Sequence, residues 1–194
     1  GGAPPPGGAG GPGRAVLCDA WWARSPRLHR VRTERVLGPL RIAYDNPAHL
    51  GVDRFLSMLG QCGEGASLVV GVGTALTLDL LDGGGLHRGG RIAPSPRTMR
   101  EALHARAAQL PVEGGIYAEF ADDTGDALAS GCEGAALALV ERSLGAATAL
   151  LGESPAVCLH GGGADLLRDR LPGHRWQPDA VLRGLARWHA LRIA

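Results

Sequence analysis

Three short runs of aliphatic and β-branched residues, separated by glycine-rich turns, constrain the fold of this chain more than any other feature. The runs cover residues 67–72, 75–81 and 86–92, and the turns fall at Gly73-Thr74 and at residues 82–85. Runs of this length between such turns are typical of neighbouring antiparallel strands. The sequence therefore predicts a three-stranded meander in the middle of the chain.

Apolar residues at helical spacing predict helices before and after this meander. One helix begins near Gly51, a second covers about residues 99–110, a long third one is capped by Asp123 or Thr124, and the last begins at Asp179. The positions that we expect to face the core are Val52, Phe55, Leu56, Leu59, Met99, Leu103, Ala107, Leu110, Leu128, Cys132, Ala135, Leu139, Leu144, Val181, Leu185 and Trp188.

A buried strand is expected at residues 156–159, followed by three glycines at 161–163 and a short helix. Together these elements predict an α/β or α+β fold in which helices pack on a mixed sheet. The order of elements also resembles one half of the actin-like and sugar-kinase-like fold.

The basic residues exclude several classes of phosphate chemistry. All 20 are arginine and none is lysine, so a Walker A loop, a Schiff-base lysine and a protein-kinase ATP lysine are impossible. The 19 acidic residues bring the net charge to +1, and the arginines are dispersed, which argues against a nucleic-acid partner. We find no apolar run long enough for a membrane span and no signal peptide, and expect a cytoplasmic protein. The four cysteines and seven histidines show no metal-ligand spacing.

The first 13 residues hold seven Gly and four Pro, which predicts a flexible leader over residues 1–13. Residues 14–43 give the least interpretable pattern in the chain.

Three segments carry candidate chemistry. A turn at Gly73-Thr74 exposes successive backbone N–H groups and a hydroxyl, which can hold phosphate oxygens without a positive side chain; an ordinary hairpin corner has the same sequence. Asp53 and Arg54 at the first turn of a helix could accept a proton from an alcohol and bind an anion, or could be a solvated pair at a helix start. The glycines after residue 159 could admit a ring or a phosphate close to the backbone, or form a simple strand-to-helix turn.

Taken in order, the motifs resemble the type III pantothenate kinases from about Tyr44 to the C-terminus. They are Asn46-Pro-x-x-Leu-Gly-Val-Asp-Arg54, Gly71-Val-Gly-Thr-Ala-Leu-Thr77, Gly89-Gly-x-Ile-x-Pro94, Thr124-x-x-Ala-Leu-x-Ser-Gly131 and Gly161-Gly162.

The resemblance implies an actin-like ATPase (ribonuclease H-like, sugar-kinase-like) fold and phosphorylation of pantothenate by ATP with Mg²⁺, the first step toward coenzyme A, in a homodimer. Residues 14–43 would be a remnant of the first ribonuclease H-like domain, and residues 44–194 the second domain. The implied roles are a catalytic base at Asp53, pantothenate contacts at Tyr44, Gly51, Val52, Asp53, Arg54 and Thr124, and ATP contacts at Gly73, Thr74, Gly161 and Gly162.

Two departures from the family pattern bear on activity. The string Asp-x-Gly-Asn-Thr, which binds ATP phosphates in the family, does not occur in the 194 residues. We therefore expect either an N-terminally incomplete copy of the enzyme or a catalytically inactive binding or dimerisation module. Gly71 stands where the family has an Asp that helps to bind a monovalent cation, so the K⁺ or NH₄⁺ requirement of the family is not expected here.

Overall fold

The computed structural model describes residues 29–193, and the chain divides into two units, Gly1–Arg32 and Thr33–Ala194. The expected leader and the first part of segment 14–43 lie outside the described residues. The hairpin of β1 (Val36–Leu37) and β2 (Leu40–Arg41) belongs to the second unit, and the expected domain boundary at residue 43 stays a prediction.

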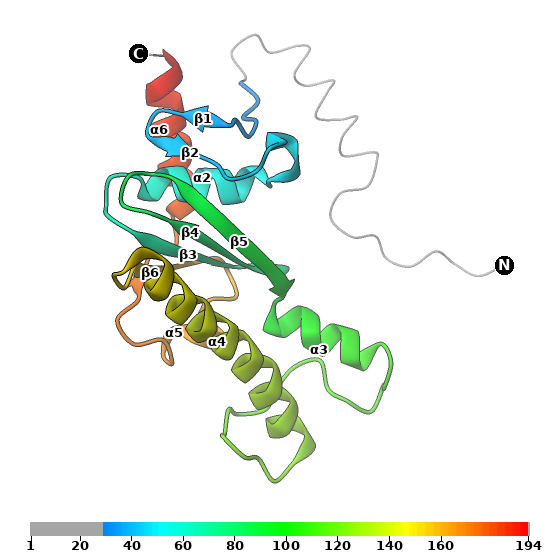
Figure 1. Cartoon of the computed structure of the whole chain (residues 1–194). Coiled ribbons are helices and arrows are strands. Elements are labelled where there is room, and N and C mark those ends of the chain that lie inside the picture. Colours follow the sequence, from blue (N-terminus) through cyan, green and yellow to red (C-terminus); the bar gives the residue numbers. More distant parts are fainter. Residues whose placement is uncertain (1–28, 194) are drawn as a thin grey trace, which may run out of the picture. The chain divides into compact units, whose positions relative to one another are not determined.

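A five-stranded mixed sheet forms the centre of this unit (Figure 1). Its strands are β3 (Ser67–Val72), β4 (Ala75–Leu81), β5 (His87–Pro94), β6 (Ala156–His160) and β7 (Arg175–Trp176), in the order β5-β4-β3-β6-β7. Strands β3, β4 and β5 pair antiparallel, whereas β6 pairs parallel with β3 and β7 parallel with β6. The predicted meander is confirmed, and the mixed sheet with flanking helices confirms the α/β fold class.

The two faces of the sheet differ in chemistry because successive side chains of a strand alternate between them. One face is aliphatic and packs against α4 (Thr124–Leu151). Its core residues are Leu68, Val70, Val72, Leu76, Leu78, Leu80, Val157 and Leu159, which meet Ala136, Leu137, Val140 and Ala147 of α4. The opposite face carries Asp79 and Cys158, whose partners lie on α2 (Val52–Gln61). This mixed-polarity face is where a site can form.

The last helix, α6 (Ala180–Ile193), packs directly on α2 at two glycines. A Cβ on Gly184 would lie 1.8 Å from the carbonyl oxygen of Leu56, and one on Gly60 would lie 2.9 Å from that of Ala180. Among residues 180–192 of α6, those that are buried are Ala180, Gly184 and Trp188. Of the three expected inward residues Trp188 is correct, but Val181 is half-buried and Leu185 is 38% exposed.

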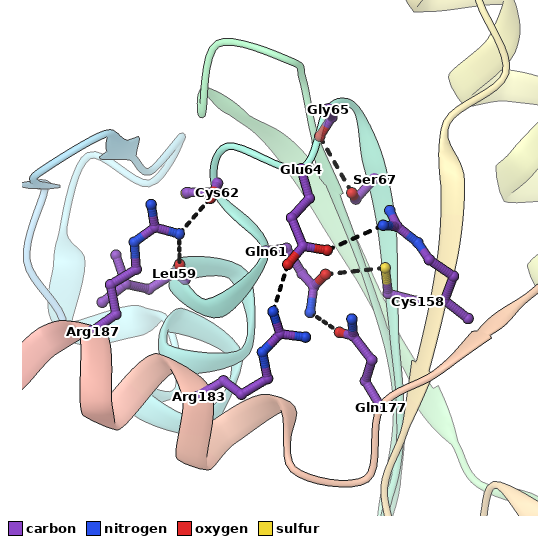
Figure 2. A network of polar contacts seen from close by, with 11 residues as sticks. Leu59, Gln61, Cys62, Glu64, Gly65, Ser67, Cys158, Gln177, Arg183 and Arg187 are labelled. Carbon is purple, nitrogen blue, oxygen red and sulfur yellow. Dashed lines mark hydrogen bonds and ion pairs between the residues drawn. The ribbon is translucent and has the colours of Figure 1, made fainter.

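A polar network joins α2 to the sheet and to α6 (Figure 2). The Gln61 side chain accepts a hydrogen bond from the Cys158 thiol at 3.2 Å and donates one to Gln177. At the rim Glu64 pairs with Arg175 at 3.1 Å and with Arg183 at 2.5 Å. These contacts tie the C-terminal end of α2 to β6, β7 and α6, so that its first turn is held in place over the sheet.

The remaining elements are η1 (Pro47–His49), α3 (Pro96–His104) and α5 (Asp165–Arg168). The second predicted helix therefore ends at residue 104 instead of 110. The long helix begins as expected, with the Asp123 carboxylate accepting from the N–H groups of Gly125 and Asp126. Its expected core stripe is only partly right, because Ala135 is exposed and Ala136 and Val140 are buried instead.

By length and composition alone, α4 could cross a membrane, with a mean hydropathy of 1.3 over its most apolar 18 residues. Its inner residues nevertheless belong to the hydrophobic core against the sheet. One side of α4 thus packs on the sheet, although only 28% of those 18 residues are buried.

Candidate functional site

The start of α2 is built by short-range hydrogen bonds. Asn46 accepts from the N–H of Ala48 at 3.1 Å and thereby begins η1, and the N–H of Leu50 donates to the carbonyl of Pro47. Gly51 then serves as the N-cap of α2 and Asp53 lies in the first turn. A Cβ on Gly51 would lie 2.7 Å from Asp53 Oδ1, so the absence of a side chain at Gly51 makes room for the carboxylate.

The turn between β3 and β4 faces this helix start. The N–H of Gly73 donates to the carbonyl of Ala75 at 3.0 Å, which closes the hairpin. The carbonyl of Thr74 accepts from the hydroxyl of Thr98 at 2.6 Å and from the N–H of Ser95 at 3.4 Å. The beginning of α3 thus fixes the turn from outside, while Gly73 and Thr74 remain exposed.

The turn after β6 supplies the third wall. Gly161 has φ +100°, and a Cβ there would lie 2.4 Å from the carbonyl oxygen of Val72. The same carbonyl accepts from the N–H of Gly163 at 3.0 Å. Only glycine fits such a close approach of two backbones at positive φ, so this turn is fixed against the end of β3.

The three segments enclose one cavity of about 400 Å³. Of the predicted site residues, those in its wall are Asp53, Arg54, Gly73, Thr74 and Gly161. Asp53 and Thr74, which are distant in sequence, therefore share one cavity as the sequence hypothesis requires.

The other predicted residues lie outside this wall. Tyr44 reaches the site indirectly, since its hydroxyl accepts from Arg54 Nη1 at 3.4 Å. Gly51 and Val52 precede Asp53 on the exposed start of α2, and Gly162 follows Gly161 on the surface. Thr124 is exposed at the first position of α4 and does not line the cavity of its own chain.

Arg54 is a buried ion-pair partner as well as a wall residue. Its guanidinium forms two hydrogen bonds with Asp79, at 2.8 and 2.6 Å, and both side chains are at most 5% exposed. His87 Nε2 lies 3.1 Å from the same carboxylate, and the His87 ring stacks on Tyr44. Burial alone would raise the pKa of Asp79, but His87 and Arg54 outweigh it and lower that pKa. The charges of Arg54 and Asp79 are thus held in fixed positions beneath the site.

Two polar residues of the wall, Thr77 and His160, were not among the predicted site residues. Both lie opposite Gly71, since Thr77 pairs with it across the antiparallel ladder and His160 across the parallel one. Thr77 ends the motif at residues 71–77 and His160 precedes Gly161-Gly162. The local sequence does not show that the two residues meet, because the parallel pairing of β3 with β6 joins segments that are distant in the chain.

The surroundings of Gly71 do not fit a monovalent cation. Gly71 has no carboxylate, and a Cβ there would already lie 2.8 Å from Thr77 Oγ1 and 3.0 Å from the His160 ring. Among residues 29–193 no group of three His, Cys, Asp or Glu side chains could hold a metal ion.

Comparisons with known proteins found a matching family model, similar sequences and a similar fold. The family model described as "Type III pantothenate kinase" matches residues 12–145. A type III pantothenate kinase of Stenotrophomonas maltophilia (strain R551-3) is 57% identical over 175 residues, which are 90% of this chain and 72% of that protein. One from Xanthomonas campestris pv. campestris (strain B100) is 56% identical and is covered to 68%. A solved structure titled as a conserved putative Baf family transcriptional activator from Campylobacter jejuni has a TM-score of 0.60 at 20% identity, covering 76% of this chain and 66% of that one, and shares the fold.

Proposed function

Because this chain belongs to the type III pantothenate kinase family, we propose that it transfers the γ-phosphoryl group of ATP to the primary hydroxyl of pantothenate. The product is 4'-phosphopantothenate, the first intermediate of coenzyme A biosynthesis. The observation that carries this proposal is the single cavity that Asp53 shares with the Gly73-Thr74 turn.

Asp53 is the proposed general base. The hydroxyl oxygen of pantothenate attacks the γ-phosphorus, its proton passes to the Asp53 carboxylate, and the bond to the β,γ-bridging oxygen breaks to release ADP. A carboxylate in the cavity wall suits this role, since the alcohol would approach it from within the cavity that the Gly73-Thr74 turn also lines.

Backbone groups would hold the phosphates. The Gly73-Thr74 turn and Gly161 line the cavity, and Gly162 follows the second turn. Because the Gly73 N–H already donates to the Ala75 carbonyl, the amides of Thr74 and Gly161 would be the phosphate donors. Concave turns of this kind bind anions without a lysine, which agrees with a chain that contains none.

Pantothenate would contact Tyr44, the Gly51–Arg54 turn, and Thr124 of a second copy. This arrangement calls for a homodimer, and we propose that the dimer works in the cytoplasm. Mg²⁺ would arrive with ATP and neutralise charge on its phosphates. Within the described part of the chain, the side-chain hydroxyls of Thr74 and Thr77 in the cavity wall would be the oxygen donors that fit it, while Asp53 stays free to act as the base.

The proposal is tested by ADP release from ATP with and without pantothenate, in the wild type and in Asp53→Asn. We expect pantothenate-dependent turnover that falls by at least about 10²-fold in the variant, because general-base catalysis contributes that much. Circular dichroism should be unchanged, since Asp53 lies exposed at the start of α2. Turnover of Asp53→Asn at the wild-type rate would show that Asp53 is not the base. ADP release that does not depend on pantothenate would show that pantothenate is not the substrate.

A further inference from the structure

The His160 ring occupies a position that Gly71 creates. The two residues are direct partners in the parallel ladder of β6 and β3. An ideal Cβ on Gly71 would lie 3.0 Å from both Cε1 and Nε2 of His160. The edge of the imidazole therefore lies over the backbone of Gly71, in space that any larger residue at 71 would take.

This edge belongs to the cavity wall together with Asp53, Thr74 and Gly161. His160 immediately precedes Gly161, whose turn is a proposed phosphate site, and it comes from a different strand than the Gly73-Thr74 turn. In the part of the chain that the structure describes, we find no hydrogen bond from any side chain to the His160 ring. A half-buried imidazole without a protein partner, facing a polar cavity, is available to a ligand.

We propose that the His160 ring donates a hydrogen bond to a phosphate oxygen of the bound nucleotide and takes up a proton when that phosphate enters. The inference rests on the proposed function and assigns the ring a role in that site. The proton comes from solvent as the nucleotide binds and returns to it when the nucleotide leaves, so the catalytic cycle consumes none.

In the protein without a nucleotide, the surroundings of His160 favour a neutral ring that can be protonated when a phosphate binds. Burial lowers the pKa of the His160 imidazole below 6.5, although the charges of Asp53 on α2 and Asp79 on β4 act in the opposite direction. Arg54, the other charged wall residue from α2, is neutralised by its ion pair with Asp79, and α6 contributes the apolar Val181. The ring is therefore largely neutral at pH 7 in the free protein. The negative charge of a phosphate next to it would favour the imidazolium.

The test is an NMR pH titration of the histidine rings of the full chain, with and without ADP and Mg²⁺, which cannot turn over. The His160 signal is assigned by its loss in His160→Asn. We expect its titration midpoint to rise by about one pH unit or more in the presence of ADP.

Amide signals of Gly73 and Thr74, recorded in the same samples, separate this inference from the proposed function. If those amides respond to ADP and the His160 midpoint does not move, the inference is wrong and the proposed function stands. If no amide of the cavity responds at any ADP concentration, the nucleotide site itself is wrong and both fall.

Two further variants distinguish a phosphate contact from a merely structural ring. His160→Gln keeps a neutral hydrogen-bond donor, so we expect its ADP affinity to lie closer to the wild type than that of His160→Ala. In the wild type, ADP affinity should also fall as the pH rises from 6.5 to 8.5, because binding takes up a proton. His160→Gln should lack this additional loss of affinity. Gly71→Ala places a methyl group against the ring and should reduce the shift of the His160 midpoint. Equal affinity and equal pH dependence in the wild type, His160→Gln and His160→Ala would overturn the proposal.

Discussion

Arg54 and Asp79 form a buried pair beneath the candidate site, with hydrogen bonds of 2.6 and 2.8 Å and His87 beside the same carboxylate. The sequence pattern suggested a free guanidinium for anion binding or a solvated side chain. A free or solvated guanidinium does not fit, because Arg54 is 5% exposed and paired with Asp79 of β4, while its contact with the substrate stays a prediction. Its contribution to the site is the rigid placement of the first turn of α2, which carries Asp53.

Asp79→Asn should therefore destabilise the protein strongly. The change leaves the Arg54 charge buried without its counter-charge, which costs about 3 kcal/mol or more. The matched control is Asp45→Asn, whose side chain is 99% exposed and should cost less than about 0.5 kcal/mol. Urea unfolding at pH 7 measures both. Equal stability of the two variants would contradict the energetic role of the buried pair.

The difference in unfolding free energy between the wild type and Asp79→Asn should change with pH in one direction. The pKa of Asp79 is lowered from 3.8 in the folded protein. The stabilisation from its ionised form is thus fully present above the unfolded value and is lost as the pH falls through the folded value. The stability difference between the wild type and Asp79→Asn should be constant from pH 7 to about 5 and shrink below pH 4. Unfolding curves at three or four pH values test this, and a difference that grows on acidification would contradict it.

The residue at position 71, a glycine, leads to a prediction about the effect of K⁺ on ATP turnover. Because it offers no carboxylate and its surroundings are filled by Thr77 and His160, we expect ATP turnover to change less than about twofold when K⁺ replaces Na⁺ at constant ionic strength. Steady-state rates in matched chloride salts measure this. A steep rise with K⁺ would show that another group provides the cation site.

At the scale of elements, the crossing of α6 over α2 depends on Gly184. A methyl group there would meet the Leu56 carbonyl oxygen at 1.8 Å, so Gly184→Ala must separate the helices and should cost about 3 kcal/mol. The matched control is Gly145→Ala on α4, where the added Cβ has no described atom outside its own helix backbone within 4 Å. That change should stabilise the protein by up to about 1 kcal/mol. Thermal and urea unfolding of both variants provide the measurement, and a neutral Gly184→Ala would contradict the close packing.

The packing of α6 on α2 also illustrates which parts of the fold could be predicted from the sequence and which could not. Strands β3 and β4 and the starts of α2 and α4 were predicted to the residue or within one, because turns and caps are encoded locally. The inward face of α6 was partly wrong because the pattern favours large apolar residues, whereas the closest contact is at Gly184. The stripe of α4 was partly wrong because alanine, leucine and glycine occur on all its sides. The strands β1, β2 and β7 have two residues each and give no periodic signal.

The residues of the candidate site also fall into those that local sequence predicts and those that it does not. Asp53, Thr74 and Gly161 were predictable because each lies in a local turn with its own chemistry. His160 and the pairing of Arg54 with Asp79 were not, because both depend on which strands become neighbours in the sheet. Register between distant segments is a property of the whole fold.

For the whole molecule, the position of Thr124 predicts how two copies complete one site. Thr124 is exposed at the start of α4 and does not line the cavity that holds Asp53 of the same chain. Only 28% of the most apolar 18 residues of α4 are buried within one chain, which leaves an apolar surface that a second copy could cover. We therefore expect a homodimer in which Thr124 of one protomer contacts the pantothenate bound by the other.

Mixing two impaired variants tests this arrangement. In a heterodimer of Asp53→Asn and Thr124→Ala, one site has both residues intact and the other has neither. Random exchange makes about half of the dimers mixed, so activity should recover to about a quarter of the wild-type level. Sedimentation or light scattering confirms the dimer and tagged copies confirm exchange. Mixed dimers with no more activity than the two variants alone would place Thr124 outside the site, because a contact within one chain cannot be restored by a partner.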